Sequence, residues 1–472
     1  MDAALGKALG VLDGAVRHDQ GRVTLVKADV LRTDAMDRLA RLAVFAGGDD
    51  ERDAARWLIW ELAQEAGCPP ASIHDLYTAR GRGDCGGFTV PAMNVRAMAY
   101  DTARAIFRAA IPRQVGALIL EIARSEMSYT DQRPAEYASV ILAAALREGF
   151  RGPVFIQGDH FQVNAKKFAA APELEVGAIR MLIDEALAAG FYNIDIDTST
   201  LVNLDHDTLD AQQRENFERA AELTQHVRAG EPDGVTVSVG GEIGEVGGKN
   251  STVEELRAFM DGYQRTLGRL GDHVGLSKIS VQTGTAHGGV VLPDGAIAEV
   301  KLDLDALREL SRVAAQEYGL AGAVQHGAST LPPDAFGNFP TYGACEIHLA
   351  TNFQNIIFDH PALPDDLKAR IRAYVTTHHA DERKARDSDE QFQYKTRKKA
   401  IGPFKRELWE LPADVKQPIT RDLEAQFGFL FDQLNVGGTA ATVARFVRAP
   451  AIRHAAPRPV AVTAPDDADA GE

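Results

Sequence analysis

Histidines and acidic residues stand at the ends of several short apolar runs in this chain. The segments FIQGDH, SVGGE, SVQTGTAH, AVQH and EIHL end on or next to His160, Glu242, His287, His326 and His348. A lone histidine is usually structural, but three or more after successive apolar runs are difficult to explain as core filling. Three neutral imidazoles that leave one coordination position open are a common catalytic zinc arrangement. The pattern therefore predicts a divalent metal held by His160, His287 and His326.

These side chains can meet only if the runs are parallel strands of one sheet. Eight apolar runs alternate with amphipathic helices, at 88–95, 117–122, 154–157, 193–197, 235–239, 278–282, 321–325 and 346–349. Helical periodicity predicts helices at 134–148, 174–189, 209–228, 253–270 and 304–318, the fourth with a capping box of Ser251 and Glu254. The alternation predicts an α/β fold, a (β/α)8 TIM barrel, whose strands deliver their C-terminal residues to one rim. A doubly wound open sheet has the same alternation and is the alternative.

The remaining segments indicate four regions. Residues 1–84 are predicted to be an N-terminal helical extension and 85–360 the barrel. Residues 361–448 are predicted to be a C-terminal helical region, which contains the basic stretch YKTRKKAIGPFKR at 394–406. The tail at 449–472 is rich in Ala, Pro and Asp and is predicted to be disordered.

Glycines directly follow two of the predicted metal ligands. Gly288 follows His287, and Gly327 follows His326 with Ser329 two residues later. Backbone N–H groups at such glycines can approach a phosphate, and Ser329 would add a hydroxyl. Ordinary strand-to-helix turns also need glycine, so the alternative is a turn without a ligand.

Several of these segments together resemble class II, metal-dependent ketose-bisphosphate aldolases, the fructose- and tagatose-bisphosphate enzymes. VPAMNV matches the first-strand motif with Asn94 in place, and GDH supplies an acidic residue, Asp159, before the first histidine ligand, His160. GGEIGEVGG carries Glu242, while TAHGG and QHGAS match the segments of the second and third ligands. EIHLATN resembles the eighth-strand motif, with Thr351 retained.

The resemblance implies a lyase that reversibly cleaves fructose 1,6-bisphosphate or a related sugar phosphate to dihydroxyacetone phosphate and an aldehyde, through a metal-stabilised enediolate. The metal would be zinc, with cobalt or manganese as alternatives, and Glu242 would be a further ligand. Asp159 would transfer the proton of the cleaved alcohol. The substrate and its phosphate would contact Asn94, Gly288, Gly327, Ser329 and Thr351. A homo-oligomer, dimer or tetramer, is also expected, because in the family a C-terminal arm can reach a neighbouring subunit's phosphate pocket.

The sequence departs from the family at two positions. His348 replaces an asparagine that helps to hold the enediolate, and Lys249-Asn250 stands where a mobile loop usually carries a glutamate. We expect His348 to take over the catalytic hydrogen bond of that asparagine. The alternative is a non-catalytic aldolase-like partner subunit or sugar-phosphate sensor that retains the metal site.

Three other features have two interpretations. Lys278 opens a predicted strand and could form a Schiff base, although such lysines are usually structural. Asp197 could line the pocket or cap the next helix. The basic stretch that contains Lys398 could be an arm that reaches a phosphate, or a solvated helix.

Composition excludes some classes of partner. The 472 residues carry a formal charge of −16, which argues against nucleic acid and against an anionic membrane surface. No apolar run approaches the roughly 18 residues of a membrane span. The three cysteines are scattered, and the charged start lacks a secretory segment, so a cytoplasmic location is expected.

Overall fold

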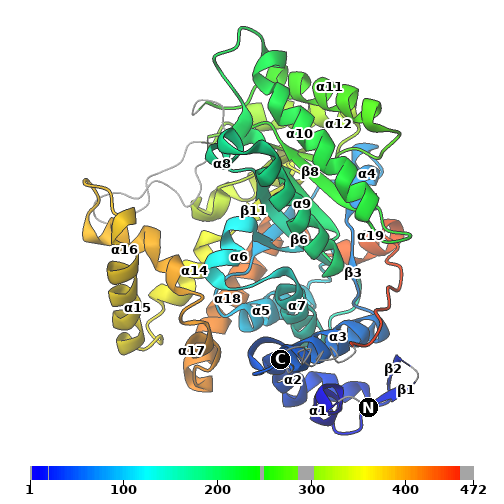
Figure 1. Cartoon of the computed structure of the whole chain (residues 1–472), viewed down its shortest axis with the longest axis vertical. Helices are drawn as coiled ribbons and strands as arrows, with labels where there is room; N and C mark the ends of the chain where they lie inside the picture. Colours follow the sequence, from blue (N-terminus) through cyan, green and yellow to red (C-terminus); the bar gives the residue numbers. More distant parts are fainter. Residues whose placement is uncertain (1–2, 20, 245–248, 285–301, 458–472) are drawn as a thin grey trace, which may run out of the picture.

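The computed structural model describes residues 3–19, 21–244, 249–284 and 302–457, and its centre is a closed parallel barrel (Figure 1). The eight strands are β4 (Val90–Asn94), β5 (Ile119–Ala123), β6 (Val154–Gln162), β7 (Asn193–Asp197), β8 (Ser238–Glu242), β9 (Lys278–Val281), β10 (Ala323–Gln325) and β11 (Glu346–Leu349). Each strand pairs in parallel with the next, and β11 pairs with β4 to close the ring. The predicted TIM barrel is therefore confirmed, and the open doubly wound sheet is wrong.

The helices around the barrel follow the predicted periodicity closely. Helices α7 (Pro134–Glu148), α11 (Val253–Leu270) and α12 (Leu304–Tyr318) have the predicted bounds, and α9 (Pro172–Ala188) and α10 (Leu209–Gly230) lie within two residues of them. The capping box of α11 is Thr252 with Glu255, one residue after the predicted pair. Ser251 instead accepts a hydrogen bond from the Gln282 backbone N–H at 2.9 Å, so it fastens the helix start to the end of β9.

The N-terminal segment is mostly helical and supports the barrel from outside and below. It contains α1 (Ala3–Val11), the hairpin β1 (Val16–Asp19) and β2 (Arg22–Leu25), α2 (Asp34–Phe45), α3 (Asp49–Ala66), β3 (Pro70–Ala71) and α4 (His74–Gly81). Helices α2 and α3 pack on α7, and β3 adds a short parallel pairing to β6. From α4, the Arg80 guanidinium donates to the carbonyls of Ala321, Gly343 and Ala344, just before β10 and β11. This places α4 under the N-terminal ends of the strands.

The C-terminal segment continues as helices. Its α-helices are α15 (Asp365–His378), α16 (Asp389–Thr396), α17 (Lys405–Trp409), α18 (Ala413–Gln433) and α19 (Thr439–Phe446). The remaining α-helices among the described residues belong to the barrel region and are α5 (Ala99–Ala110), α6 (Arg124–Thr130), α8 (Ala165–Ala170), α13 (Asn338–Thr341) and α14 (Thr351–Asp359). Helix α18 packs against α5, and α15 and α16 project from one side of the barrel (Figure 1).

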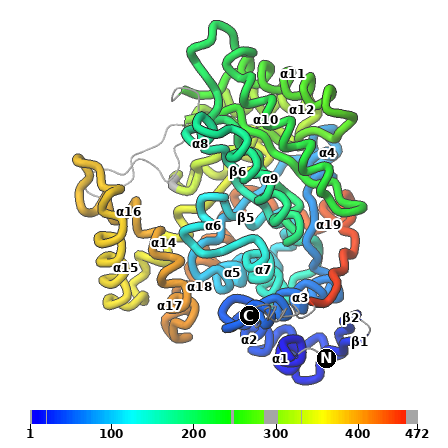
Figure 2. The backbone as a smooth tube through the Cα atoms, viewed as in Figure 1, coloured from blue at the N-terminus to red at the C-terminus, as the bar shows by residue number. Residues whose placement is uncertain are grey.

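After α19 the chain returns to the N-terminal helices (Figure 2). The indole N–H groups of Trp57 and Trp60 donate to the carbonyls of His454 and Ile452, at 3.0 and 2.7 Å, and the His454 ring stacks on Trp60. The structure therefore differs from the predicted disordered tail over residues 450–457. The four predicted region boundaries are not otherwise tested and stay a prediction.

A layer of charged residues lies inside the barrel, where TIM barrels usually place bulky apolar side chains. Glu121, Asp195, Lys278 and Glu346 come from the alternate strands β5, β7, β9 and β11 and are buried. The Lys278 ammonium lies 2.9 Å from Asp195 Oδ1 and 2.5 Å from Glu346 Oε1. Gly240 on β8 leaves the space for this pair, because a Cβ there would meet the Asp195 carboxylate and lie 2.8 Å from Lys278 Cε.

We therefore expect Gly240→Ala to lower the free energy of unfolding by about 1–3 kcal/mol, the usual cost of overpacking a well-filled core. Urea or thermal denaturation would measure this. Gly268→Ala is the matched control, because Gly268 lies in α11 and a Cβ there meets nothing within 4 Å. That substitution should stabilise the protein by about 0.5–1 kcal/mol. Equal stability of the two variants would contradict the interpretation of Gly240.

Candidate active site

A β-bulge in β6 places two neighbouring residues at the mouth of the barrel. The register of β6 against β7 advances by three residues from Gly158 to Phe161 while β7 advances by two, so β6 contains one extra residue. His160 within the bulge has φ +42°, a left-handed conformation that is uncommon outside glycine. Successive residues of a regular strand point to opposite faces, whereas Asp159 and His160 both line the same pocket here.

His160 is oriented by two carboxylates from neighbouring strands. Its Nδ1 lies 3.1 Å from Asp197 Oδ2 and 3.3 Å from Glu242 Oε2. Asp197 also accepts hydrogen bonds from the Ser199 backbone N–H and hydroxyl, at 3.1 and 2.6 Å. Of the two sequence interpretations of Asp197, the capping one therefore applies; Asp197 is not among the residues that line the pocket, but it orients the imidazole of His160, which does line it. A metal-binding histidine typically has its second ring nitrogen held by such a carboxylate.

Three of the predicted histidines meet in the pocket. The ring centroids of His160 and His326 are 4.3 Å apart, and those of His326 and His348 are 4.0 Å apart. Ligand atoms of His160, Glu242 and His326 lie within 4.8 Å of one another, and so do those of Asp159, His326 and His348. His326 Nε2 also lies 2.9 Å from the Ser280 hydroxyl, which fixes the orientation of its ring. The described residues thus contain donor sets with the composition of a divalent-metal site.

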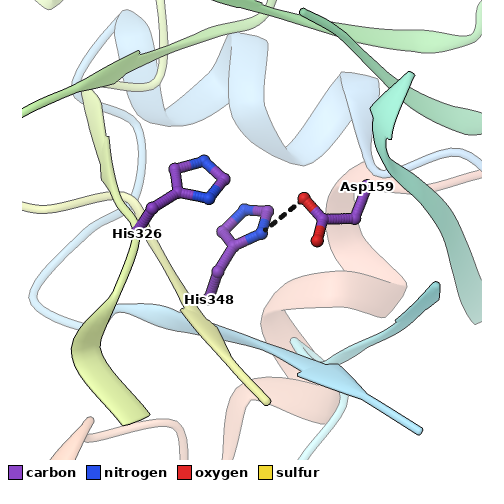
Figure 3. A group of neighbouring side chains, drawn as sticks. All are labelled: Asp159, His326 and His348. Carbon is purple, nitrogen blue, oxygen red and sulfur yellow. Dashed lines mark ion pairs between the residues drawn. The ribbon is translucent and has the colours of Figure 1, made fainter. Parts of the chain in front are cut away.

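His348 lies at the floor of the pocket among four carboxylates. Its Nε2 lies 2.6 Å from Glu346 Oε1 and 3.7 Å from Asp195 Oδ2. Its Nδ1 lies 3.1 Å from Glu121 Oε2 and 3.2 Å from Asp159 Oδ1; Figure 3 shows the contact with Asp159. His348 is 5 % exposed, so these carboxylates dominate its surroundings.

This crowding of carboxylates changes the pKa values of the cluster. Burial raises the pKa of Glu121 to about 7, and the neighbouring charge of Asp159 adds to the effect. Burial would lower the pKa of His348, but Glu121 and Asp159 raise it well above the ordinary value. Burial would likewise lower the pKa of His160, but Asp159 and Glu242 raise it well above the ordinary value. The cluster therefore attracts cations, whether protons or metal ions.

Lys278 lies below this cluster rather than at the rim. It is buried, and its ammonium donates to Gln157 Oε1, Asp195 Oδ2 and Glu346 Oε1 at 2.8, 3.0 and 2.5 Å. Burial opposes the charge of Lys278, but Asp195 and Glu346 raise its pKa. A protonated amine with three acceptors cannot attack a carbonyl, so the Schiff-base interpretation of Lys278 is not supported. Glu242 is not a partner of Lys278; it lies beside His160.

Hydroxyl and backbone groups also line the pocket. The pocket has a volume of about 490 Å³, and Gly327, Ser329 and Thr351 line it. Gly327 has φ +68° after β10, and Thr351 is the first residue of α14 after β11. The Ala350 backbone N–H donates to the Ser329 hydroxyl oxygen at 2.6 Å, which ties the two loops together. Loops after strands seven and eight with a helix N-terminus are the usual phosphate site of TIM barrels.

Some predicted residues lie elsewhere. Asn94 does not line the pocket, and its amide donates to Glu126 at 2.5 Å. Glu126 and its ion-pair partner Arg96 line the pocket instead. His287 and Gly288 fall outside the described residues. Asn250, at the second departure from the family, is half-buried and donates to Asp303 at 3.1 Å.

Sequence reasoning missed several pocket residues. Glu121 interrupts the apolar run 117–122, and a charge inside a strand was the available signal. Lys398 was not missed, because the sequence left its basic stretch as either an arm that reaches a phosphate or a solvated helix, and Lys398 lines the pocket. That stretch is held on the same chain, because the Gly402 N–H donates to the Tyr129 carbonyl and Lys405 lies 2.5 Å from Glu136. Lys398 is therefore a cation in the pocket of its own subunit, rather than a residue of a solvated helix.

Comparisons with known proteins agree with this geometry. The family model described as fructose-bisphosphate aldolase class-II matches residues 82–404. The search of curated proteins found no match. Among solved structures, a probable tagatose 6 phosphate kinase from Sinorhizobium meliloti has a TM-score of 0.52 at 16% identity, over 75% of this chain and 100% of that chain. A fructuronate-tagaturonate epimerase from Cohnella laeviribosi has a TM-score of 0.51 at 13% identity, over 90% of each chain.

A putative fructose-1,6-bisphosphate aldolase from Coccidioides immitis has a TM-score of 0.46 at 17% identity, over 78% of this chain and 97% of that chain. At these identities the first two likenesses support the barrel fold alone. Within the described residues, no helix is long and apolar enough to cross a membrane.

The position of Lys278 leads to a stability prediction. Lys278→Met should lower the free energy of unfolding by about 3–5 kcal/mol, because it leaves Asp195 and Glu346 buried without their cation. Chemical denaturation would measure the loss, and exposed Lys166→Met should have little effect. Borohydride reduction with substrate present should leave no adduct on the wild-type chain. An adduct on Lys278 would overturn this assignment.

Proposed function

The chain belongs to the class II fructose-bisphosphate aldolase family, and we propose that it is a metal-dependent lyase acting on a phosphorylated ketose. The substrate would be fructose 1,6-bisphosphate or a related sugar phosphate, cleaved reversibly to dihydroxyacetone phosphate and an aldehyde. The observation that carries the proposal is the bulge in β6, which puts the Asp159 carboxylate beside the cluster of histidines.

The residues present fit a divalent metal. His160, Glu242 and His326 offer two imidazoles and a carboxylate from three strands, and their donor atoms lie within 4.8 Å of one another. His287 is proposed as a further ligand from the sequence alone. When bound, a divalent cation would polarise the substrate carbonyl and stabilise negative charge as a Lewis acid. Zinc is the proposed ion, with cobalt and manganese as alternatives.

Asp159 is the proposed proton carrier. Cleavage requires a base that removes the proton from the hydroxyl of the carbon that becomes the aldehyde, and addition requires its return. Asp159 lines the pocket and lies 3.6 Å from His160 Nε2, so a substrate oxygen near His160 would also be near this carboxylate. His348 can act as a hydrogen-bond donor only through Nδ1, because its Nε2 is engaged by Glu346.

Hydroxyl, backbone and lysine groups of the pocket are proposed to bind the substrate phosphates. Gly327, Ser329 and Thr351 supply backbone and hydroxyl donors next to the N-terminus of α14. Lys398 and Lys167 line the rim, and the structure records no ion pair for either among the described residues. A ketose with two phosphates would thus meet hydroxyl and backbone donors as well as two lysines in the pocket.

A specific observation favours an enzyme over a sensor. Binding a metal and a phosphate does not require a proton carrier, yet Asp159 is retained and buried within the cluster. The location in the cytoplasm and a homo-oligomeric assembly remain proposals.

Removal of the metal is the first test of the proposed function. Exhaustive chelation should abolish cleavage of fructose 1,6-bisphosphate or of another active ketose phosphate, and added zinc, cobalt or manganese should restore it. The assay panel should include tagatose 1,6-bisphosphate, fructuronate and tagaturonate. His326→Ala should lose metal and activity together, as measured by elemental analysis and turnover. Full activity in the chelated protein would refute the metal-dependent mechanism.

A second test of the proposed function distinguishes the role of Asp159 from that of the metal ligands. Asp159→Asn keeps the size of the side chain but removes the base, so kcat should fall at least ~100-fold. The metal should remain bound, and the melting temperature should change little. Ser329→Ala is the comparison variant, since losing a phosphate donor should raise KM more than it lowers kcat. Near-normal turnover of Asp159→Asn would remove Asp159 from the mechanism.

A further inference from the structure

We propose that Arg397 is a positioning residue of the candidate active site: it fastens the basic stretch to α14 and thereby holds the Lys398 ammonium in the pocket, as the counterion of an anionic substrate group. Arg397 and Lys398 are neighbours in a short 3-10 helix, Arg397–Ala400, that follows α16. Lys398 lines the pocket, whereas Arg397 does not. The inference rests on the proposed function for the substrate, a phosphorylated ketose, and adds the residue that sets the position of its counterion.

The Arg397 side chain is held by a carboxylate, an amide and two aromatic rings. Its Nη1 and Nη2 donate to Oδ1 and Oδ2 of Asp359 at 2.5 and 2.9 Å, and Nη2 also donates to Asn355 Oδ1 at 2.7 Å. The guanidinium carbon lies 5.5 and 5.1 Å from the ring centroids of Phe358 and Tyr394. Only 14 % of the side chain is exposed. A two-pronged ion pair that also stacks on rings fixes the geometry of an arginine, and a lysine cannot reproduce it.

Both acceptors of Arg397 lie on the helix that begins at the pocket. Helix α14 begins at Thr351, which lines the pocket, and Asn355 and Asp359 follow at intervals of four residues. Residues four apart lie on the same face of a helix, so one face of α14 carries Thr351 and both acceptors. Within the described residues, the pair of Arg397 with Asp359 is the only ion pair between the basic stretch and α14. Arg397 is therefore tied to the same rigid element that supplies a proposed phosphate-binding hydroxyl.

Lys398 brings an ammonium without a counterion to the pocket. Its Nζ lies 5.7 Å from the ring centroid of Tyr129, and among the described residues it forms no ion pair. Burial lowers the pKa of Lys398, and the neighbouring charge of Arg96 adds to the effect. A partly buried cation without a partner is costly, so an anionic group that enters the pocket would gain from pairing with it.

The adjacent lysine lacks these properties. The Nζ of Lys399 lies 5.8 Å from the centroid of the same Tyr129 ring, but it pairs with Glu382 at 3.5 Å. Lys399 also does not line the pocket. Two neighbouring lysines thus share a ring contact, and only Lys398 combines a place in the pocket with the absence of a counterion in the part of the chain described. This difference makes Lys399 the matched control for Lys398.

Other polar contacts hold the stretch on either side of Lys398. After it, the Gly402 N–H donates to the Tyr129 carbonyl at 2.9 Å, and Lys405 lies 2.5 Å from Glu136. Before it, the Asn355 amide donates to the Tyr394 hydroxyl at 3.0 Å. This neutral hydrogen bond to α14 is weaker than a charge-assisted pair. Loss of Arg397 should therefore leave the stretch attached and release the position of Lys398.

The test is a double-mutant cycle on the metal-loaded, full-length chain, with the active ketose phosphate as substrate and inorganic phosphate as equilibrium probe. Lys398→Met should raise KM and the phosphate Kd about tenfold or more, the scale of a lost charge-assisted hydrogen bond, with little change in kcat. Arg397→Met should raise both by a smaller factor. Adding Arg397→Met to Lys398→Met should have no further effect, because Arg397 acts through Lys398.

Two matched variants serve as controls. Lys399→Met removes the neighbouring ammonium. Arg370→Met removes another ion-paired and ring-stacked arginine of the C-terminal segment, which pairs with Glu407 at 2.6 Å and lies 5.7 Å from the Phe404 centroid. Both should leave KM and the phosphate Kd unchanged. Arg397→Lys keeps the charge without the fork and should restore part of the affinity.

Melting temperatures establish that each variant is folded, and Asp359→Asn tests the same ion pair if Arg397→Met does not fold. Unchanged KM and phosphate Kd in Arg397→Met, an additive loss in the double variant, or a wild-type chain that binds no phosphate would overturn the positioning role. Weaker phosphate binding by both variants of a chain that cleaves no ketose phosphate would instead refute the aldolase and leave the positioning role standing. Cleavage with unchanged KM in both variants would do the reverse.

Discussion

The ion pairs of Lys278 with Asp195 and Glu346, inside the barrel, are the interactions on which the site depends. Each of these ions loses its hydration on burial, so the layer is stable only when every partner is in place. Glu346, fixed by Lys278, holds Nε2 of His348 and so turns Nδ1 toward the pocket. The same requirement explains a glycine at position 240, because any side chain there would enter the space of the ion pair.

The bulge in β6 is the second constraint, and it acts on a different strand. A regular strand would have put one of Asp159 and His160 outside the barrel. The extra residue and the left-handed conformation of His160 bring both to the rim, where Asp197 then orients the imidazole. A metal ligand and a candidate proton carrier are therefore adjacent in sequence and also in space, which makes their relative position independent of loop motion.

Two kinds of polar group line the pocket. Its floor is rich in carboxylates and imidazoles, which attract cations, and the pocket also carries hydroxyls, backbone N–H groups and Lys398, which attract anions. A phosphorylated sugar with a carbonyl in the middle satisfies both requirements at once. His348, where the family has an asparagine, makes the floor still better suited to cations, because imidazole nitrogen is a far better metal ligand than an amide.

The sequence alone determined the order of strands and helices and the residues at the strand ends, because periodicity and turn chemistry are local properties. It located β11 with His348 and β10 with His326, and so placed both on one rim once a barrel was assumed. Only the tertiary structure decided the closure of the barrel, the bulge in β6 and the partners of Lys278. These depend on pairings between distant segments: Lys278 meets Asp195 and Glu346 across 83 and 68 residues. The sequence left two interpretations of the basic stretch around Lys398, and only the path of the C-terminal segment places Lys398 in the pocket.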